Sequence, residues 1–292
     1  MKPISYLQRF GNIELAVRKH GQGMPLVWGH NLLGSMRVDD QAGIWDWEEL
    51  EEHCMLARYD ARGHGNSDGS YAAKDYRWST LGNDMLRVAD SVTSTDGSYI
   101  LGGASMGCCA ALEAALKAPD KVAGLILALP PTAWRSRPMQ AVRYKRQAWL
   151  SGAFGATPYR VLDYLPDARQ HVDARRRLSN TVARGLATAN PLYVQAALEG
   201  AVKSDLPKKR LLRKLDVPTL IFSWNGDATH PLSTAKILAD TLPNVQSLVI
   251  SDANDVSDWT ATACNFIDQV SKSRKHRAAR RAGKGNSANA KP

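Results

Sequence analysis

The chain has 292 residues, 44% of them hydrophobic and 23% charged, a composition typical of a globular protein with one large domain or two small ones. No apolar run reaches the roughly 18 residues of a membrane span, and no export signal begins the chain, so we expect a cytoplasmic protein without a membrane span. The net charge of +10 comes from residues 133–214 and 272–292 alone, which argues against a nucleic-acid-binding protein.

Seven short apolar runs predict β-strands. Several of them are apolar throughout, which is typical of parallel strands whose sheet is covered by helices on both faces. In chain order the runs are IELAV (13–17), MPLVW (24–28), CMLARY (54–59), SYILGG (98–103), VAGLILAL (122–129), PTLIFSW (218–224) and VQSLVIS (245–251).

Helical patterns lie between these runs. Leu81, Met85 and Val88 recur at helical spacing within residues 80–92, and proline or serine marks the ends of other segments. The alternation of strands and helices predicts an α/β fold, a mainly parallel sheet with helices on both faces. The predicted helices are residues 80–92, 106–118, 233–242 and 256–270.

The alternation stops between Pro130 and Pro218, where two arginine-rich segments have helical patterns. We therefore expect a helical cap, residues 131–214, inserted into a core of residues 1–130 and 215–272. Most cap arginines are expected to face solvent. The cap aromatic residues are expected to form the cap's own core: Trp134, Tyr144, Trp149, Phe154, Tyr159 and Tyr164.

The last segment, residues 273–292, is rich in lysine and arginine and has almost no large apolar side chain to bury. Such a composition predicts a disordered basic tail. Contact with nucleic acid through this tail is a weaker hypothesis for the function of the protein.

The segment GGASMG (102–107) follows a predicted strand and opens a predicted helix. A serine on such a tight turn is held in a strained backbone conformation that lifts its hydroxyl above the sheet. Gly103 and Gly107, two residues on either side, let the turn close without clashes. A loop of small residues with an incidental serine is the alternative, but the strand–turn–helix context favours Ser105 as a nucleophile.

With this motif the sequence resembles the α/β-hydrolase superfamily, and the likeness covers nearly all of the chain except its tail. Upstream, WGHNLLGS (28–35) is similar to the family's His-Gly-x-x-Gly-Ser loop, with Asn31 in place of the usual glycine. The resemblance implies that the backbone N–H groups of Leu32 and Met106 form an oxyanion hole. It also implies that His30 orients this loop from inside the core.

SWNGDATHP (223–231) is similar to the family loop in which an aspartate lies four residues before a proline. The resemblance implies that Asp227 is the acid that orients a catalytic histidine, and Ser105 precedes it as the family's chain order requires. An aspartate that only caps a helix or closes a turn is the alternative.

The family's catalytic histidine is missing from its usual loop after the last strand, residues 251–259. We predict that His230, three residues after Asp227, is the base instead, although one short loop must then make both the Asp–His and the His–Ser contacts. The alternative is that His230 only packs before Pro231 at the start of the next helix. His30 is the second choice. Asp255 in the usual loop would be too weakly basic at a reference pKa of about 3.9, unless burial raised it strongly.

Together these residues predict a serine hydrolase that acts on an ester, lactone or related acyl bond of a small molecule, without a metal or organic cofactor. The alternative is a non-hydrolytic protein of the same fold that binds a small molecule or regulates a partner, because a serine without a base is a weak nucleophile. Neither the substrate nor the oligomeric state can be deduced from the sequence.

Overall fold

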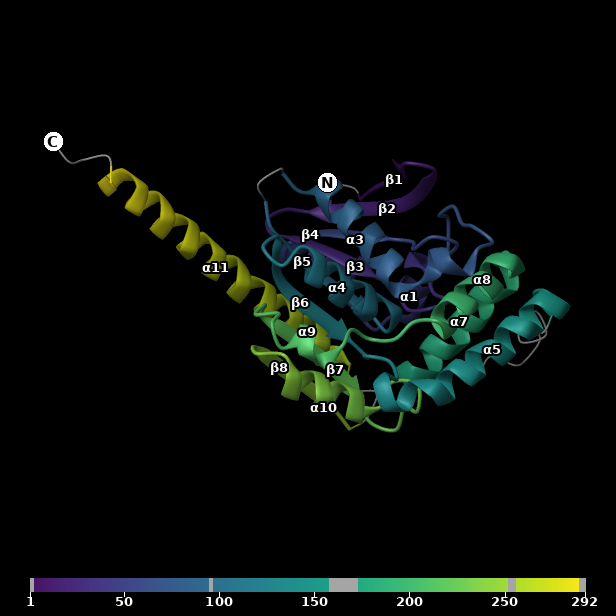
Figure 1. Cartoon of the computed structure of the whole chain (residues 1–292). Coiled ribbons are helices and arrows are strands. Elements are labelled where there is room, and N and C mark those ends of the chain that lie inside the picture. The colour runs from purple at the N-terminus through teal and green to yellow at the C-terminus, as the bar shows by residue number, and fades with distance from the viewer. Residues whose placement is uncertain (1–2, 95–96, 158–172, 252–255, 289–292) are drawn as a thin grey trace.

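One mixed β-sheet forms the centre of the protein. The computed structural model describes residues 3–94, 97–157, 173–251 and 256–288. Within these residues eight strands form one sheet in the order β1-β2-β4-β3-β5-β6-β7-β8 (Figure 1). β2 pairs antiparallel with β1 and β4, and the remaining pairs are parallel. The strands are β1 (Ile4–Phe10), β2 (Ile13–Gly21), β3 (Pro25–Gly29), β4 (Met55–Tyr59), β5 (Tyr99–Ala104), β6 (Val122–Ala128), β7 (Thr219–Trp224) and β8 (Val245–Ile250).

The sheet confirms the predicted α/β fold and contains one further strand, β1, that the pattern of apolar runs does not predict. Each of the seven apolar runs overlaps a strand. β1 lies at the edge of the sheet, where exposed and half-buried residues alternate, so its sequence has no continuous apolar run. In β6, by contrast, all residues are buried, because other strands flank it and helices cover both of its faces.

Helices cover both faces of the sheet. On one face, α3, α4 and α10 share an apolar cluster with strand residues such as Leu101 and Ile221. On the other face, α2 and α11 lie against the alternate strand residues, and the ring of Trp259 contacts that of Phe222. The helices are α2 (Trp47–His53), α3 (Trp78–Val92), α4 (Met106–Lys117), α10 (Leu232–Thr241) and α11 (Ser257–Ala288).

Between β6 and β7 the described residues form helices and no strand. We call three of them the cap helices: α5 (Arg137–Phe154), α7 (Ala174–Thr188) and α8 (Pro191–Val202). The short α9 (Lys209–Leu212) leads back to the sheet. In Figure 1 the cap helices lie at the end of the sheet toward which the arrow of β6 points, the edge at which the parallel strands end.

The cap aromatic residues do not all form a core, which corrects the prediction. Tyr144 is buried between the cap helices, but Trp149 and Phe154 are 65% and 55% exposed and contact each other edge to face. Tyr159 and Tyr164 lie outside the described residues. The reason is that α5 buries a single stripe, spaced three or four residues apart, and Trp149 falls outside it; the stripe is Arg137, Gln140, Tyr144, Ala148 and Ser151.

The chain end also differs from the predicted disordered tail over residues 273–292. Helix α11 continues to Ala288, and Figure 1 shows its second half extending away from the sheet. Alanine, arginine and lysine have high helix propensity, so they continue a helix whose first turns pack on the sheet. No helix in the described part of the chain is long and apolar enough to cross a membrane.

Candidate active site

Ser105 lies between the last residue of β5 and the first residue of α4, with a φ of 52° that is rare for any residue except glycine. The turn packs tightly against the end of β3. A Cβ atom at position 103 or 107 would collide with the carbonyl oxygen of Gly29, so both positions require glycine. The predicted strand–turn–helix geometry therefore exists, and Ser105 is 6% exposed at its tip.

His230 contacts both Ser105 and Asp227. The Ser105 hydroxyl lies 2.9 Å from Nε2 of His230, and Nδ1 of His230 lies 2.8 Å from Oδ2 of Asp227. The other carboxylate oxygen of Asp227 accepts the backbone N–H groups of Thr229 and His230, at 2.8 and 3.1 Å. One short loop thus makes both contacts. This is possible because Asp227 accepts the backbone N–H groups of the residues that follow it, which holds the His230 backbone close to the carboxylate.

The carboxylate of Asp227 is held in its ionised form. Burial alone would raise its pKa, but the hydrogen bond and charge interaction with His230, and the indole N–H that Trp224 donates at 2.9 Å, lower that pKa far below its usual range. Trp224 was not singled out in the sequence, although an indole three residues before an acid can reach it across a turn. An ionised carboxylate accepts the Nδ1–H proton and leaves Nε2 free to accept the Ser105 hydroxyl proton.

Leu32 and Met106 come from neighbouring strand ends, since β3 pairs with β5. Met106 is the first residue of α4, and its N–H is therefore among those that have no partner within the helix. Leu32 lies in a turn closed by a 2.9 Å bond from the Gly34 N–H to the Asn31 carbonyl, which does not involve the Leu32 N–H. The fold thus brings the two residues predicted to form the oxyanion hole to neighbouring strand ends, and Met106 directly follows Ser105.

His30 has no free ring nitrogen with which to contact Ser105. Its Nδ1–H donates to the carbonyl oxygen of Asn31 at 2.7 Å, and its Nε2 accepts the backbone N–H of Ala61 at 2.9 Å. Burial lowers the pKa of His30 to about 4, so the ring stays neutral at pH 7. His30 therefore joins the turn that carries Leu32 to the end of β4, and the structure does not bring this second-choice base to the serine.

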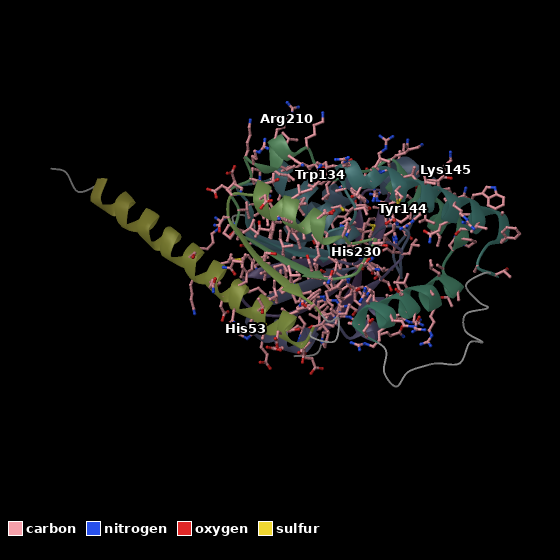
Figure 2. All side chains as sticks on the ribbon, turned by 90° about the horizontal axis from the view of Figure 1, so that it is seen from below. His53, Trp134, Tyr144, Lys145, Arg210 and His230 are labelled. Carbon is pink, nitrogen blue, oxygen red and sulfur yellow. The ribbon has the colours of Figure 1, made fainter. Side chains whose placement is uncertain are left out.

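Cap residues approach the same loop. The Arg175 side chain of α7 donates to the carbonyl oxygen of Gly226 at 2.6 Å, one residue before Asp227. In Figure 2 His230 lies near the centre of the view, whereas Lys145 and Arg210 lie at its periphery. Asp255, the remaining candidate from the sequence, lies outside the described residues.

Comparison with known proteins places the chain in a family. The family model described as alpha/beta hydrolase fold matches residues 43–261. No curated protein matches the chain in sequence. A thermophilic esterase from Thermogutta terrifontis is similar at 22% identity and a TM-score of 0.67, over 96% of this chain and 99% of the esterase.

Two further solved structures show the same fold. The enol-lactonase from Burkholderia xenovorans LB400 has 19% identity and a TM-score of 0.71, over 90% of this chain and 99% of its own. A putative lipase from Acinetobacter baumannii AYE has 18% identity and a TM-score of 0.72, over 93% of each chain. Because the family model matches most of the chain, the protein belongs to the α/β hydrolase fold family.

Proposed function

We propose that the protein is a serine hydrolase that cleaves an ester, lactone or related acyl bond of a small molecule, with Ser105 as the nucleophile. The observation that carries this proposal is the unbroken hydrogen-bonded chain from Asp227 through His230 to Ser105, with both distances below 3 Å. The similarity to an esterase and an enol-lactonase supports the same class of bond.

The proposed reaction proceeds through an acyl-enzyme. Oγ of Ser105 attacks the substrate carbonyl carbon as its proton moves to Nε2 of His230, and Asp227 stabilises the imidazolium that forms. The N–H groups of Leu32 and Met106 bind the negative oxygen of the tetrahedral intermediate. His230 then gives its proton to the leaving alcohol, which departs. Water, deprotonated in turn by His230, releases the acid and restores the Ser105 hydroxyl. The site contains its own nucleophile and needs no metal or organic cofactor for these steps.

One specific observation favours the non-hydrolytic alternative, namely that the loop after β8 contains no histidine. In the proposed hydrolase the loop after β7 supplies both acid and base. In the alternative, His230 would hold the serine in place without activating it.

A fluorophosphonate probe separates the two functions. It reacts rapidly only with an activated serine, so we expect mass spectrometry to locate one adduct, on Ser105, and no adduct in Ser105→Ala or His230→Ala. Ser91→Ala, which changes a serine on α3 whose hydroxyl bonds the Val88 carbonyl, is the matched control and should label like the parent. An unlabelled parent protein would favour the non-hydrolytic function.

A further inference from the structure

A small cavity lies beside the nucleophile elbow, at the edge of the sheet where β3, β5 and β6 end. Its wall includes Asn31 and Ala104, the chain neighbours of Leu32 and Ser105. The volume open to the centre of a water molecule is about 20 Å³, which is room for one water or one group of that size. The remaining wall is mostly apolar, with Ile44, Trp45, Leu129, Leu178 and Trp259 among its residues.

Two oxygen atoms of the cavity residues are buried without a hydrogen-bond partner among the described residues: Oδ2 of Asp39 and Oδ1 of Asn31. Asp39, in α1 (Met36–Ala42), is only 8% exposed. The Asn31 amide is held in place by position 34, where a Cβ atom would collide with Oδ1, so Gly34 makes the space for this side chain. Oxygen atoms on the protein surface accept hydrogen bonds from solvent water, whereas these two acceptors are shielded from bulk solvent.

Among the residues that the structure describes, the carboxyl of Asp39 makes no ion pair, although the charge of Arg58 acts on it. The nearby Arg58 pairs with Asp40 and donates to the carbonyl of Met36. Burial raises the pKa of Asp39 to about 7, and the opposing effects of the Arg58 charge and of the Trp28 indole N–H are smaller. A buried carboxyl without a partner is costly, and a ligand with a matching donor would remove this cost.

We propose that Asp39 and Asn31 form a subsite for a small hydrogen-bond-donating group on the acyl part of the substrate, and that a primary ammonium fits it best. An ammonium brings three N–H donors to the two acceptors and a positive charge to Asp39, whereas a hydroxyl brings one donor and no charge. The inference rests on the proposed function, since it assigns the acyl group that Ser105 attacks.

The proposed position of the group on the substrate rests on the closeness of the cavity residues Asn31 and Ala104 to Leu32 and Ser105 along the chain. Asn31 and Leu32 are consecutive, so their Cα atoms lie about 3.8 Å apart. As part of the proposal, we place the bound group within one or two carbons of a carbonyl whose oxygen contacts Leu32. The substrate class is thus esters of short amino acids, with short hydroxy acids as weaker substrates.

Three esters of nearly equal size test the subsite: the 4-nitrobenzyl esters of glycine, glycolic acid and propionic acid. A charge-assisted hydrogen bond predicts that kcat/KM is about ten- to a hundredfold higher for the glycine ester than for the propionate ester, with glycolate between them. Asp39→Asn keeps the side-chain shape and should reduce the glycine-to-propionate ratio to within about twofold. Asp240→Asn, an exposed aspartate of α10, is the matched control and should keep the parent ratio.

A binding measurement decides the subsite independently of turnover. In the Ser105→Ala protein, glycinamide should bind about tenfold or more tightly than propionamide by calorimetry, and Asp39→Asn or Asn31→Ala should remove the difference. Equal binding of the two amides, or an unchanged ester ratio in a folded Asp39→Asn, would overturn the subsite while Ser105 labelling still supports the hydrolase. Loss of labelling with preferential glycinamide binding would overturn the hydrolase and leave the subsite standing.

Discussion

The imidazole of His230 has one partner on each side, and these partners belong to different strand ends. Ser105 follows β5 and Asp227 follows β7, with β6 between the two strands in the sheet. The sequence predicted Ser105 and Asp227 because each lies in a local pattern with a known geometry. It could present His230 only as a hypothesis, because the distance between two loops that are more than a hundred residues apart depends on the register of the sheet.

Replacing His230 tests the proposed base directly. Without a proton acceptor the serine hydroxyl is a poor nucleophile, so His230→Ala should lower kcat for a reactive ester by about 10⁴- to 10⁶-fold. His53→Ala, at a surface histidine that contacts Asp268, is the matched control and should retain the parent kcat. If the His230 variant turned over as fast as the parent, this residue could not be the base.

A second histidine predicts a pH dependence of folding stability. His64 is 6% exposed, donates its Nδ1–H to the carbonyl of Arg62 at 2.8 Å, and has a pKa that burial and the neighbouring His30 lower to about 3. The unfolded chain binds a proton there below a pH of about 6.5, whereas the folded chain does not until the pH is near 3. Stability is therefore lost as the pH falls through this window.

Urea unfolding of the parent and of His64→Gln at pH 7, 6, 5 and 4 measures this contribution. Relative to the variant, the parent should lose about 1 kcal/mol of unfolding free energy per pH unit between pH 6 and 4, because only the parent can take up this proton on unfolding. Parallel pH profiles for the two proteins would show that His64 does not have this role.

At the scale of single elements, helix α5 contains two aromatic side chains that the sequence does not distinguish but that differ in burial. Tyr144 and Trp149 are both aromatic residues of one helix, but only Tyr144 lies on the stripe that faces the other cap helices. Composition predicted a cap core made of all the aromatics, whereas the direction of each side chain depends on which turn of α5 meets α8. The edge strand β1 was missed for a similar reason, because its one covered face gives no continuous apolar run.

These two positions should therefore respond differently to truncation. Tyr144→Ala should lower the unfolding free energy by about 3 kcal/mol, the usual cost of removing a buried aromatic ring. Trp149→Ala should change it by less than about 0.5 kcal/mol, as at most exposed positions. Chemical denaturation measures both, and an equal loss in the two variants would show that Trp149 is covered in solution.

At the scale of the whole molecule, the excess of positive charge belongs to the cap region and to the end of α11, and the remainder of the chain is acidic. The second half of α11 extends from the body of the protein (Figure 1), whereas its first turns bury Trp259 and Ile267. Helix propensity over this end is high, but its lack of large apolar residues predicts disorder. A segment without large apolar residues can be either a solvent-exposed helix or a disordered chain, and composition alone does not distinguish these two states.

Deleting residues 275–292 keeps Arg274, which donates to the carbonyl of Asp120, and removes only the extended end. The melting temperature and ester turnover should stay within error of the parent, because a segment without apolar anchors adds little to a core. Retention on heparin should weaken and depend less on salt. A melting temperature lower by many degrees would mean that the basic end docks on the domain.

The shared origin of Asp227 and His230 has a consequence for how such a site could be inherited or transplanted. In the proposed mechanism two of the three reacting side chains travel together on residues 224–231, between β7 and α10, and the loop after β8 has no part in the reaction. Substitutions in that last loop should therefore leave the chemical step unchanged. Residues 224–231 could therefore be grafted as one segment after the corresponding strand of a relative. The graft would transfer the proposed acid, the proposed base and the turn that joins them together.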